Sequence, residues 1–159
     1  METLLIEQNT YETERYKPMP SKNHSRAQMR LSAYILNHYG QKYEVFPELA
    51  LRLPNAFQNY VPDIAIYEVG KIAVGDDEVQ VSEVPLCVVE ILSPPQTLEE
   101  LVSKIQQYFV LGLPAVWLVL PALKNICVYT TPQEYEVYKH TQKLKDKILG
   151  IEIDLSKIF

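Results

Sequence analysis

Three residues whose types can do chemistry follow one another along the chain: Asp63, Glu90 and Lys104. Asp63 follows Pro62 in one apolar run, Glu90 lies near the end of another, and Lys104 falls in a segment with helical spacing. Two carboxylates on neighbouring buried strands, together with an ammonium group, can hold a divalent cation and stabilise charge on a phosphate. This ordered set is therefore the candidate site.

Glu90 is the strongest single indication. A carboxylate inside an apolar strand is costly unless it is paired or binds a metal. The alternative is that Glu90 lies at the strand end and meets solvent or a structural lysine, because Pro94 follows closely. The residue by itself does not decide between the two interpretations.

Asp63 and Lys104 each have a simpler explanation when taken alone. Aspartate is a common turn residue, and Lys104 could pair with Glu100 one helical turn away. Asp63 gains weight if its strand lies antiparallel to that of Glu90, since close carboxylates repel unless a cation or proton lies between them. Lys104 lies in one helical column with Glu100 and Tyr108, at the edge of the apolar stripe, and could also reach the strand end where Glu90 emerges.

Other candidates are weaker. Glu48 could point into the same cleft as Asp63, although an exposed strand position is favoured. Ser93 lacks a Gly-x-Ser-x-Gly context, so capping or orienting Glu90 is a better expectation than nucleophilic attack. The three histidines, His24, His38 and His140, lack metal-ligand spacing. The five glycines are dispersed and form no phosphate-binding loop.

Hydrophobic periodicity and turn residues predict an α/β fold. Val84 to Leu92 is an almost unbroken apolar run, typical of a central strand that is covered on both faces. A strand, helix and strand around residues 97–111 require one parallel crossover, so the sheet is mixed and flanked by helices. The expected helices run from Ser21 or Asn23 to Gly40, and from a cap at Thr97 to an end at Gly112. The expected strands cover residues 43–53, 61–69, 84–92 and 114–120, followed by a hairpin over 124–140 and a short strand after 148. Pro47 should confine the first half of the 43–53 strand to a sheet edge or a bulge.

Length and composition predict one domain over residues 21–159, preceded by an N-terminal arm over residues 1–20. The net charge of −5 counts mildly against tight non-specific binding of nucleic acid, but it leaves room for a local basic cleft. No segment approaches about 18 continuous apolar residues, and the polar start is not a secretory signal. We therefore expect a cytoplasmic protein with no membrane span, in which Cys87 and Cys127 are reduced core residues.

The motifs also carry a resemblance. Their order and spacing over residues 17–159 resemble the restriction-endonuclease-like family, a branch of the PD-(D/E)XK nuclease superfamily. The matching residues are Pro62-Asp63, the block from Val88 to Ser93, Glu100, Lys104, Tyr108, Gly112 and Trp117-Leu118-Val119, with His24 on the first helix and the ending from Gly150 to Phe159.

This resemblance implies a restriction endonuclease-like core in which Asp63 and Glu90 ligate Mg²⁺ or Mn²⁺. The metal would lower the pKa of an attacking water, and the substrate would be DNA. The superfamily lysine usually stands two residues after the acid, where this chain has Leu92; Lys104 on the helix matches the position to which it has moved in this branch. Glu100 and Tyr108 would then surround the metal ligands without binding the metal themselves. A departure from the family is Leu120, where an aspartate is usual.

Two rival interpretations remain open. The chain could be a catalytically inactive relative that uses the same scaffold to bind nucleic acid or a protein partner. The carboxylates could also form only a structural ion pair with Lys104. Nucleases of this type often act as homodimers, but the sequence fixes neither an oligomeric state nor a choice between DNA and RNA.

Overall fold

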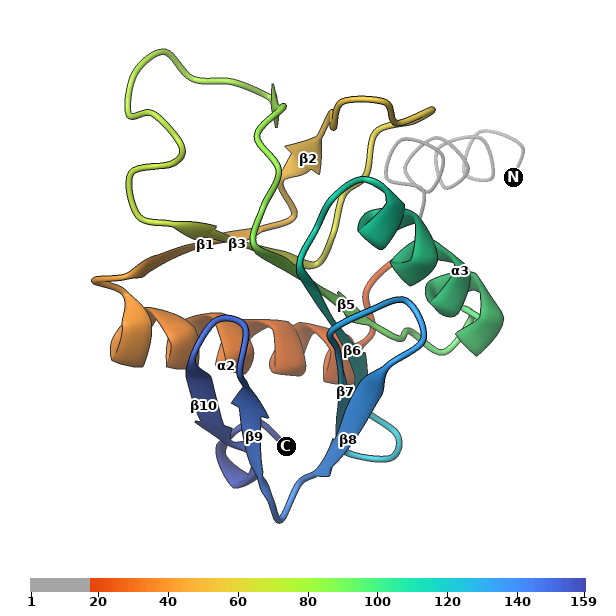
Figure 1. Cartoon of the computed structure of the whole chain (residues 1–159). Coiled ribbons are helices and arrows are strands. Elements are labelled where there is room, and N and C mark those ends of the chain that lie inside the picture. Colours follow the sequence, from red (N-terminus) through yellow and green to blue (C-terminus); the bar gives the residue numbers. More distant parts are fainter. Residues whose placement is uncertain (1–17) are drawn as a thin grey trace, which may run out of the picture.

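The computed structural model describes residues 18–159, and its centre is a six-stranded mixed sheet (Figure 1). The strand order is β1-β3-β5-β6-β7-β8; β5 and β6 are parallel, and the other neighbours are antiparallel. These strands are β1 Tyr43–Pro47, β3 Ile64–Glu68, β5 Cys87–Ile91, β6 Ala115–Leu120, β7 Asn125–Tyr129 and β8 Tyr135–Lys139. The predicted mixed α/β sheet with one parallel crossover is confirmed.

The two long helices cover opposite faces of this sheet. Helix α2 (Lys22–Tyr39) shares one core cluster with alternate sheet residues such as Val89 and Trp117, and with the hairpin β9 (Lys143–Asp146) and β10 (Ile151–Asp154). Helix α3 (Leu98–Val110) packs in the second cluster against the opposite alternation, which includes Val88. Because β5 lies between the two layers, all of its residues are buried, as predicted for a central strand.

Side-chain caps fix where both helices begin. Ser21 Oγ accepts a 3.2 Å hydrogen bond from the amide of His24, and Thr97 Oγ1 accepts one of 3.2 Å from the amide of Glu100. These bonds satisfy amides that the first turn leaves without intrahelical partners. The predicted caps are confirmed, and they set the positions of the side chains that each helix sends toward the sheet.

The predicted strand over 43–53 is wrong in its continuity. It divides into the edge strand β1 and the two-residue strand β2 (Ala50–Leu51), because Glu48 adopts a left-handed backbone with φ 58°. Strand β2 leaves the main sheet and pairs in parallel with β4 (Gln80–Val81), which lies in the 70–83 loop between β3 and β5. The edge position of β1 agrees with the effect expected of Pro47.

Strand β9 was not predicted from the sequence. Along β9 the exposed Lys143 and Lys145 alternate with the buried Leu144 and Asp146. The Asp146 carboxylate is buried because it accepts a 2.6 Å hydrogen bond from the indole of Trp117. The chain then forms β10 and a short 3₁₀-helix, Leu155–Lys157. The predicted arm over residues 1–20 lies almost entirely outside the described residues, and the single-domain boundary at residue 21 stays a prediction.

Candidate active site

The register of β3 against β5 brings the two predicted acids together. Ile64 pairs with Val89, so the next position along the same antiparallel register sets Asp63 opposite Glu90. Asp63 is the residue just before β3, and its carboxylate meets α2, whereas the carboxylate of Glu90 meets α3. Each of the two residues is only 1% exposed.

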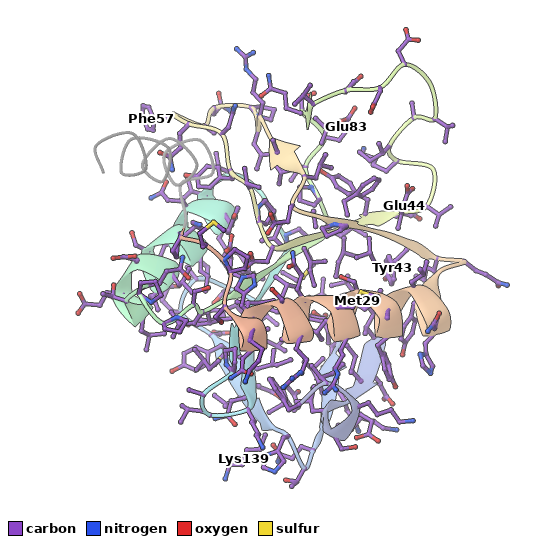
Figure 2. All side chains as sticks on the ribbon, turned by 180° about the vertical axis from the view of Figure 1, so that it is seen from behind. Met29, Tyr43, Glu44, Phe57, Glu83 and Lys139 are labelled. Atoms are coloured by element: carbon purple, nitrogen blue, oxygen red, sulfur yellow. The ribbon has the colours of Figure 1, made fainter. Side chains whose placement is uncertain are left out.

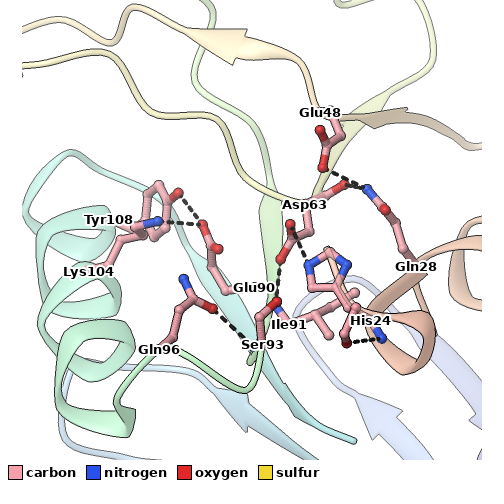
Figure 3. A network of polar contacts seen from close by, with 11 residues as sticks. His24, Gln28, Glu48, Asp63, Glu90, Ile91, Ser93, Gln96, Lys104 and Tyr108 are labelled. Atoms are coloured by element: carbon pink, nitrogen blue, oxygen red, sulfur yellow. Dashed lines mark hydrogen bonds and ion pairs between the residues drawn. The ribbon is translucent and has the colours of Figure 1, made fainter. Parts of the chain in front are cut away.

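Donors from α2 and β5 fix the orientation of Asp63 (Figure 3). His24 Nε2 lies 2.9 Å from Asp63 Oδ1, and the amide of Ile91 donates to Oδ2 at 2.7 Å. His24 is buried, and its Nδ1 has no hydrogen-bond partner. We assign the ring proton to Nε2, because that tautomer donates to the carboxylate and leaves only an acceptor unsatisfied. Asp63 is thus held on both oxygens.

Helix α3 supplies the partners of Glu90. Tyr108 donates to Glu90 Oε1 at 2.6 Å, and Lys104 Nζ lies 3.7 Å from the same oxygen. Lys104 and Tyr108 are one helical turn apart, so both reach the strand from one face of α3 (Figure 3). Glu100 is exposed, and in this described helix no ion pair joins it to Lys104. The surface pair considered as an alternative is therefore not the one that the structure has.

The pKa of the Tyr108 hydroxyl reflects both its burial and the charges of the two acids. Burial raises the pKa of the Tyr108 hydroxyl well above its ordinary value, and the charge of Glu90, its hydrogen bond and the charge of Asp63 raise the pKa further. The hydroxyl therefore remains a proton donor to Glu90 at neutral pH. Both carboxylates therefore act on one buried hydroxyl.

Glu48 lies beside Asp63, although not on a strand as expected. Its amide donates to the Asp63 carbonyl at 3.2 Å, and Gln28 Nε2 approaches both Glu48 Oε1 at 3.4 Å and the Asp63 carbonyl at 2.8 Å. Glu48 is partly buried rather than exposed. Glu48 is thus a neighbour of Asp63 and not an exposed strand residue, and its part in the site stays a prediction.

Two glutamines of this network were missed. Gln28 stands four residues after His24, so helical periodicity puts the two on one face, a signal that was available once His24 was chosen. Gln96 accepts a 3.0 Å hydrogen bond from the amide of buried Ser93, where the chain turns from β5 toward α3. Ser93 is thus tied to Gln96, and its expected action on Glu90 stays a prediction.

The donors present fit a hard divalent cation. Asp63 and Glu90 offer carboxylate oxygens, which Mg²⁺ and Mn²⁺ prefer, and Glu48 lies nearby. Within residues 18–159 no group of three or more His, Cys, Asp and Glu side chains is arranged to hold a metal ion. Mg²⁺ commonly uses only one or two carboxylates and takes its other ligands from water and substrate phosphate. The site therefore suits a cation shared with a substrate, and not a closed structural zinc site.

Comparison with known proteins gives the family. The model of the Uma2 family, described as "Putative restriction endonuclease", matches residues 12–156, and the chain belongs to this family. The predicted family resemblance is confirmed.

A solved structure shares the fold. It is the crystal structure of a putative nuclease belonging to DUF820 from Anabaena variabilis ATCC 29413, with 23% identity, a TM-score of 0.76, and coverage of 89% of this chain and 83% of that chain. No curated protein matches the sequence. Among the described helices, none has both the length and the apolar character needed to cross a membrane.

Proposed function

We propose that this chain is a metal-dependent nuclease that hydrolyses phosphodiester bonds of DNA. Membership of the family and the shared fold support a nuclease in general. One observation of the site carries the finer proposal: the Lys104 ammonium lies 3.7 Å from the buried carboxylate of Glu90, which the strand register sets opposite Asp63. Asp63 and Glu90 would hold Mg²⁺ or Mn²⁺, and Lys104 would act on the phosphate or the attacking water.

The surrounding residues keep the acids in place before any substrate arrives. His24 and the Ile91 amide hold Asp63, while Tyr108 and Lys104 hold Glu90. A preorganised site spends little free energy on rearrangement during the reaction. When bound, the cation supplies a water of lowered pKa and neutralises charge on the phosphate.

Lys104 is the residue best placed to meet the substrate. Its side chain is 17% exposed, whereas that of Glu90 is 2% exposed, so the ammonium lies at the boundary between the buried acid and solvent. An ammonium has three N–H donors. One can face Glu90 while others bind a phosphoryl oxygen whose negative charge grows in the transition state.

Plasmid cleavage tests the proposal. Wild-type protein should cut supercoiled DNA with Mn²⁺ or Mg²⁺ and not with EDTA. Asp63→Asn and Glu90→Gln should abolish cutting, while Glu100→Gln, which changes an exposed residue of α3, should cut like the wild type. Cleavage unaffected by either site variant would reject the assignment. Faster cutting of a matched RNA would change the substrate, and binding without cutting under all metals would support the inactive relative.

A further inference from the structure

The loop over residues 52–60 presents a phenylalanine directly to solvent. Phe57 is fully exposed and stands at the outer end of this loop, between β2 and β3 (Figure 2). Single exposed apolar residues are common on protein surfaces, so exposure alone does not define a site. The construction of the loop and its lining provide the further evidence.

Backbone hydrogen bonds hold this loop at its base. Leu51 and Tyr60 exchange two bonds of 2.7 and 2.9 Å, and the amide of Arg52 donates to Val81 of β4 at 2.8 Å. Asn59 Nδ2 adds a 2.8 Å bond to Gln80 Oε1. The loop is therefore anchored to the small β2–β4 sheet, and the Phe57 ring is carried on a defined support.

The loop also borders an open hollow at the protein surface. Its volume is about 350 Å³, and its lining is Arg52, Leu53, Ala56, Phe57, Gln58 and Asn59. Carboxamides and guanidinium groups are the side chains that hydrogen-bond base edges and phosphates, and aromatic rings stack on unpaired bases. The lining contains one cationic residue and no carboxylate, which suits an anionic polymer.

An aromatic contact joins this loop to the candidate active site. Tyr60, where the loop closes, packs on Tyr108 with ring centroids 5.2 Å apart. The Tyr108 hydroxyl in turn donates to Glu90. The base of the loop is therefore packed against a residue that contacts the acid Glu90.

We propose that residues 52–60 form a nucleobase-binding hollow in which Phe57 stacks on an unpaired base of the nucleic acid that the site cleaves. The inference rests on the nucleic-acid substrate of the proposed function and adds the recognition of a single-stranded or locally opened segment. Arg52 contacts phosphate or a base edge, and Gln58 offers its carboxamide to the base. Sequence preference would be weak, because stacking accepts every base.

Tryptophan fluorescence tests the stacking directly. The chain has one Trp, Trp117, which is fully buried, so a Phe57→Trp variant adds a reporter at the surface. Titration with a single-stranded oligonucleotide in EDTA should quench this reporter saturably. Val74→Trp, at an equally exposed position in the 70–83 loop, is the matched control and should show no saturable quenching.

Affinity provides the second measurement. Phe57→Ala should weaken binding of the same oligonucleotide about tenfold, and Phe57→Tyr should retain it, because base–aromatic stacking is removed only in the first. No binding by the wild type, or equal affinity of the wild type and Phe57→Ala, would overturn the inference. The inference would also be overturned if Phe57→Ala dissociated a dimer and left the oligonucleotide affinity unchanged. That result would show that this surface is an interface between two copies of the chain.

The EDTA conditions separate this inference from the proposed function. Saturable quenching at position 57 by a protein that never cuts DNA or RNA with any metal would support the hollow and reject hydrolysis. Cleavage that depends on Glu90 but is indifferent to Phe57→Ala at limiting substrate would support hydrolysis and reject the hollow.

Discussion

Tyr108 and Glu90 are joined by a buried hydrogen bond of 2.6 Å, and it ends on the same carboxylate oxygen that Lys104 faces at 3.7 Å. A hydroxyl donor and an ammonium group of one helix therefore converge on one oxygen of the central strand. The position of α3 on the sheet consequently determines how Glu90 is oriented, because both groups are fixed to that helix one turn apart.

Tyr108→Phe removes the donor to Glu90 and keeps the ring that packs on Tyr60. We expect the free energy of unfolding in urea to fall by about 1–3 kcal/mol, because a buried acceptor loses its partner. Cleavage should fall about 10- to 100-fold, as is typical when a ligand loses its orienting contact. Exposed Tyr135→Phe is the control. Lower stability with an unchanged cleavage rate would make Tyr108 purely structural.

Lys104→Ala should separate catalysis from stability. Lys104 is 17% exposed but Glu90 only 2%, so loss of the ammonium leaves a buried carboxylate with Tyr108 as its donor, and the free energy of unfolding should fall by about 1–3 kcal/mol. The cleavage rate should fall about 100- to 1,000-fold, because one preorganised positive group near the reacting phosphate is lost. Single-turnover cleavage and urea unfolding of the same preparations give both quantities. A large loss of stability with normal cleavage would favour the structural ion pair.

Most of the fold could be predicted because the local signals agree with the packing. The apolar run of β5, the caps Ser21 and Thr97 and the stop at Gly112 are each fixed by short stretches of sequence. The break at Glu48 was not predictable, because a positive φ at a non-glycine residue is imposed by the surrounding structure. Strand β9 escaped because its inward Asp146 depends on a distant indole.

The candidate site was predictable in its order but not in its contacts. The spacing of Asp63, Glu90 and Lys104 placed them on two strands and a helix; the structure has Glu90 on β5 and Lys104 on α3, and Asp63 one residue before β3. Whether Lys104 turns to Glu100 or to Glu90 depends on how α3 lies on the sheet, and one sequence does not contain that packing angle. The contact of His24 with Asp63 has the same origin, since it joins residues 39 positions apart.

Metal binding should be visible as thermal stabilisation. At a Mn²⁺ concentration 100 times its Kd, the wild type should gain about 2.7 kcal/mol, seen as a higher Tm. Asp63→Asn and Glu90→Gln should lose this gain, because each removes one carboxylate of the opposed pair. Glu100→Gln should keep the gain. Equal Mn²⁺ shifts in the wild type and both site variants would place the metal elsewhere, and no shift in the wild type would favour the inactive relative.

Alkaline pH should destabilise the fold through its buried tyrosines. Burial, and then the charge of Glu83, raises the pKa of Tyr67 above its ordinary value of 10.0, and the hydroxyl also donates to the Glu83 carbonyl at 2.7 Å. Above about pH 10 the unfolded chain releases this proton while the folded chain keeps it, so the free energy of unfolding falls as pH rises. The stabilisation is complete below that pH and is lost above it.

Urea unfolding at several values between about pH 9 and about pH 11.5 measures this slope. Tyr67→Phe should start from a lower stability, because its hydrogen bond is gone, but should decline less steeply with pH. Tyr135→Phe, which changes an exposed hydroxyl, should keep the slope of the wild type. Parallel curves for the wild type and Tyr67→Phe would show that Tyr67 ionises equally in both states. The alkaline loss of stability would then come from other groups whose pKa burial raises, such as Tyr108 and Tyr129.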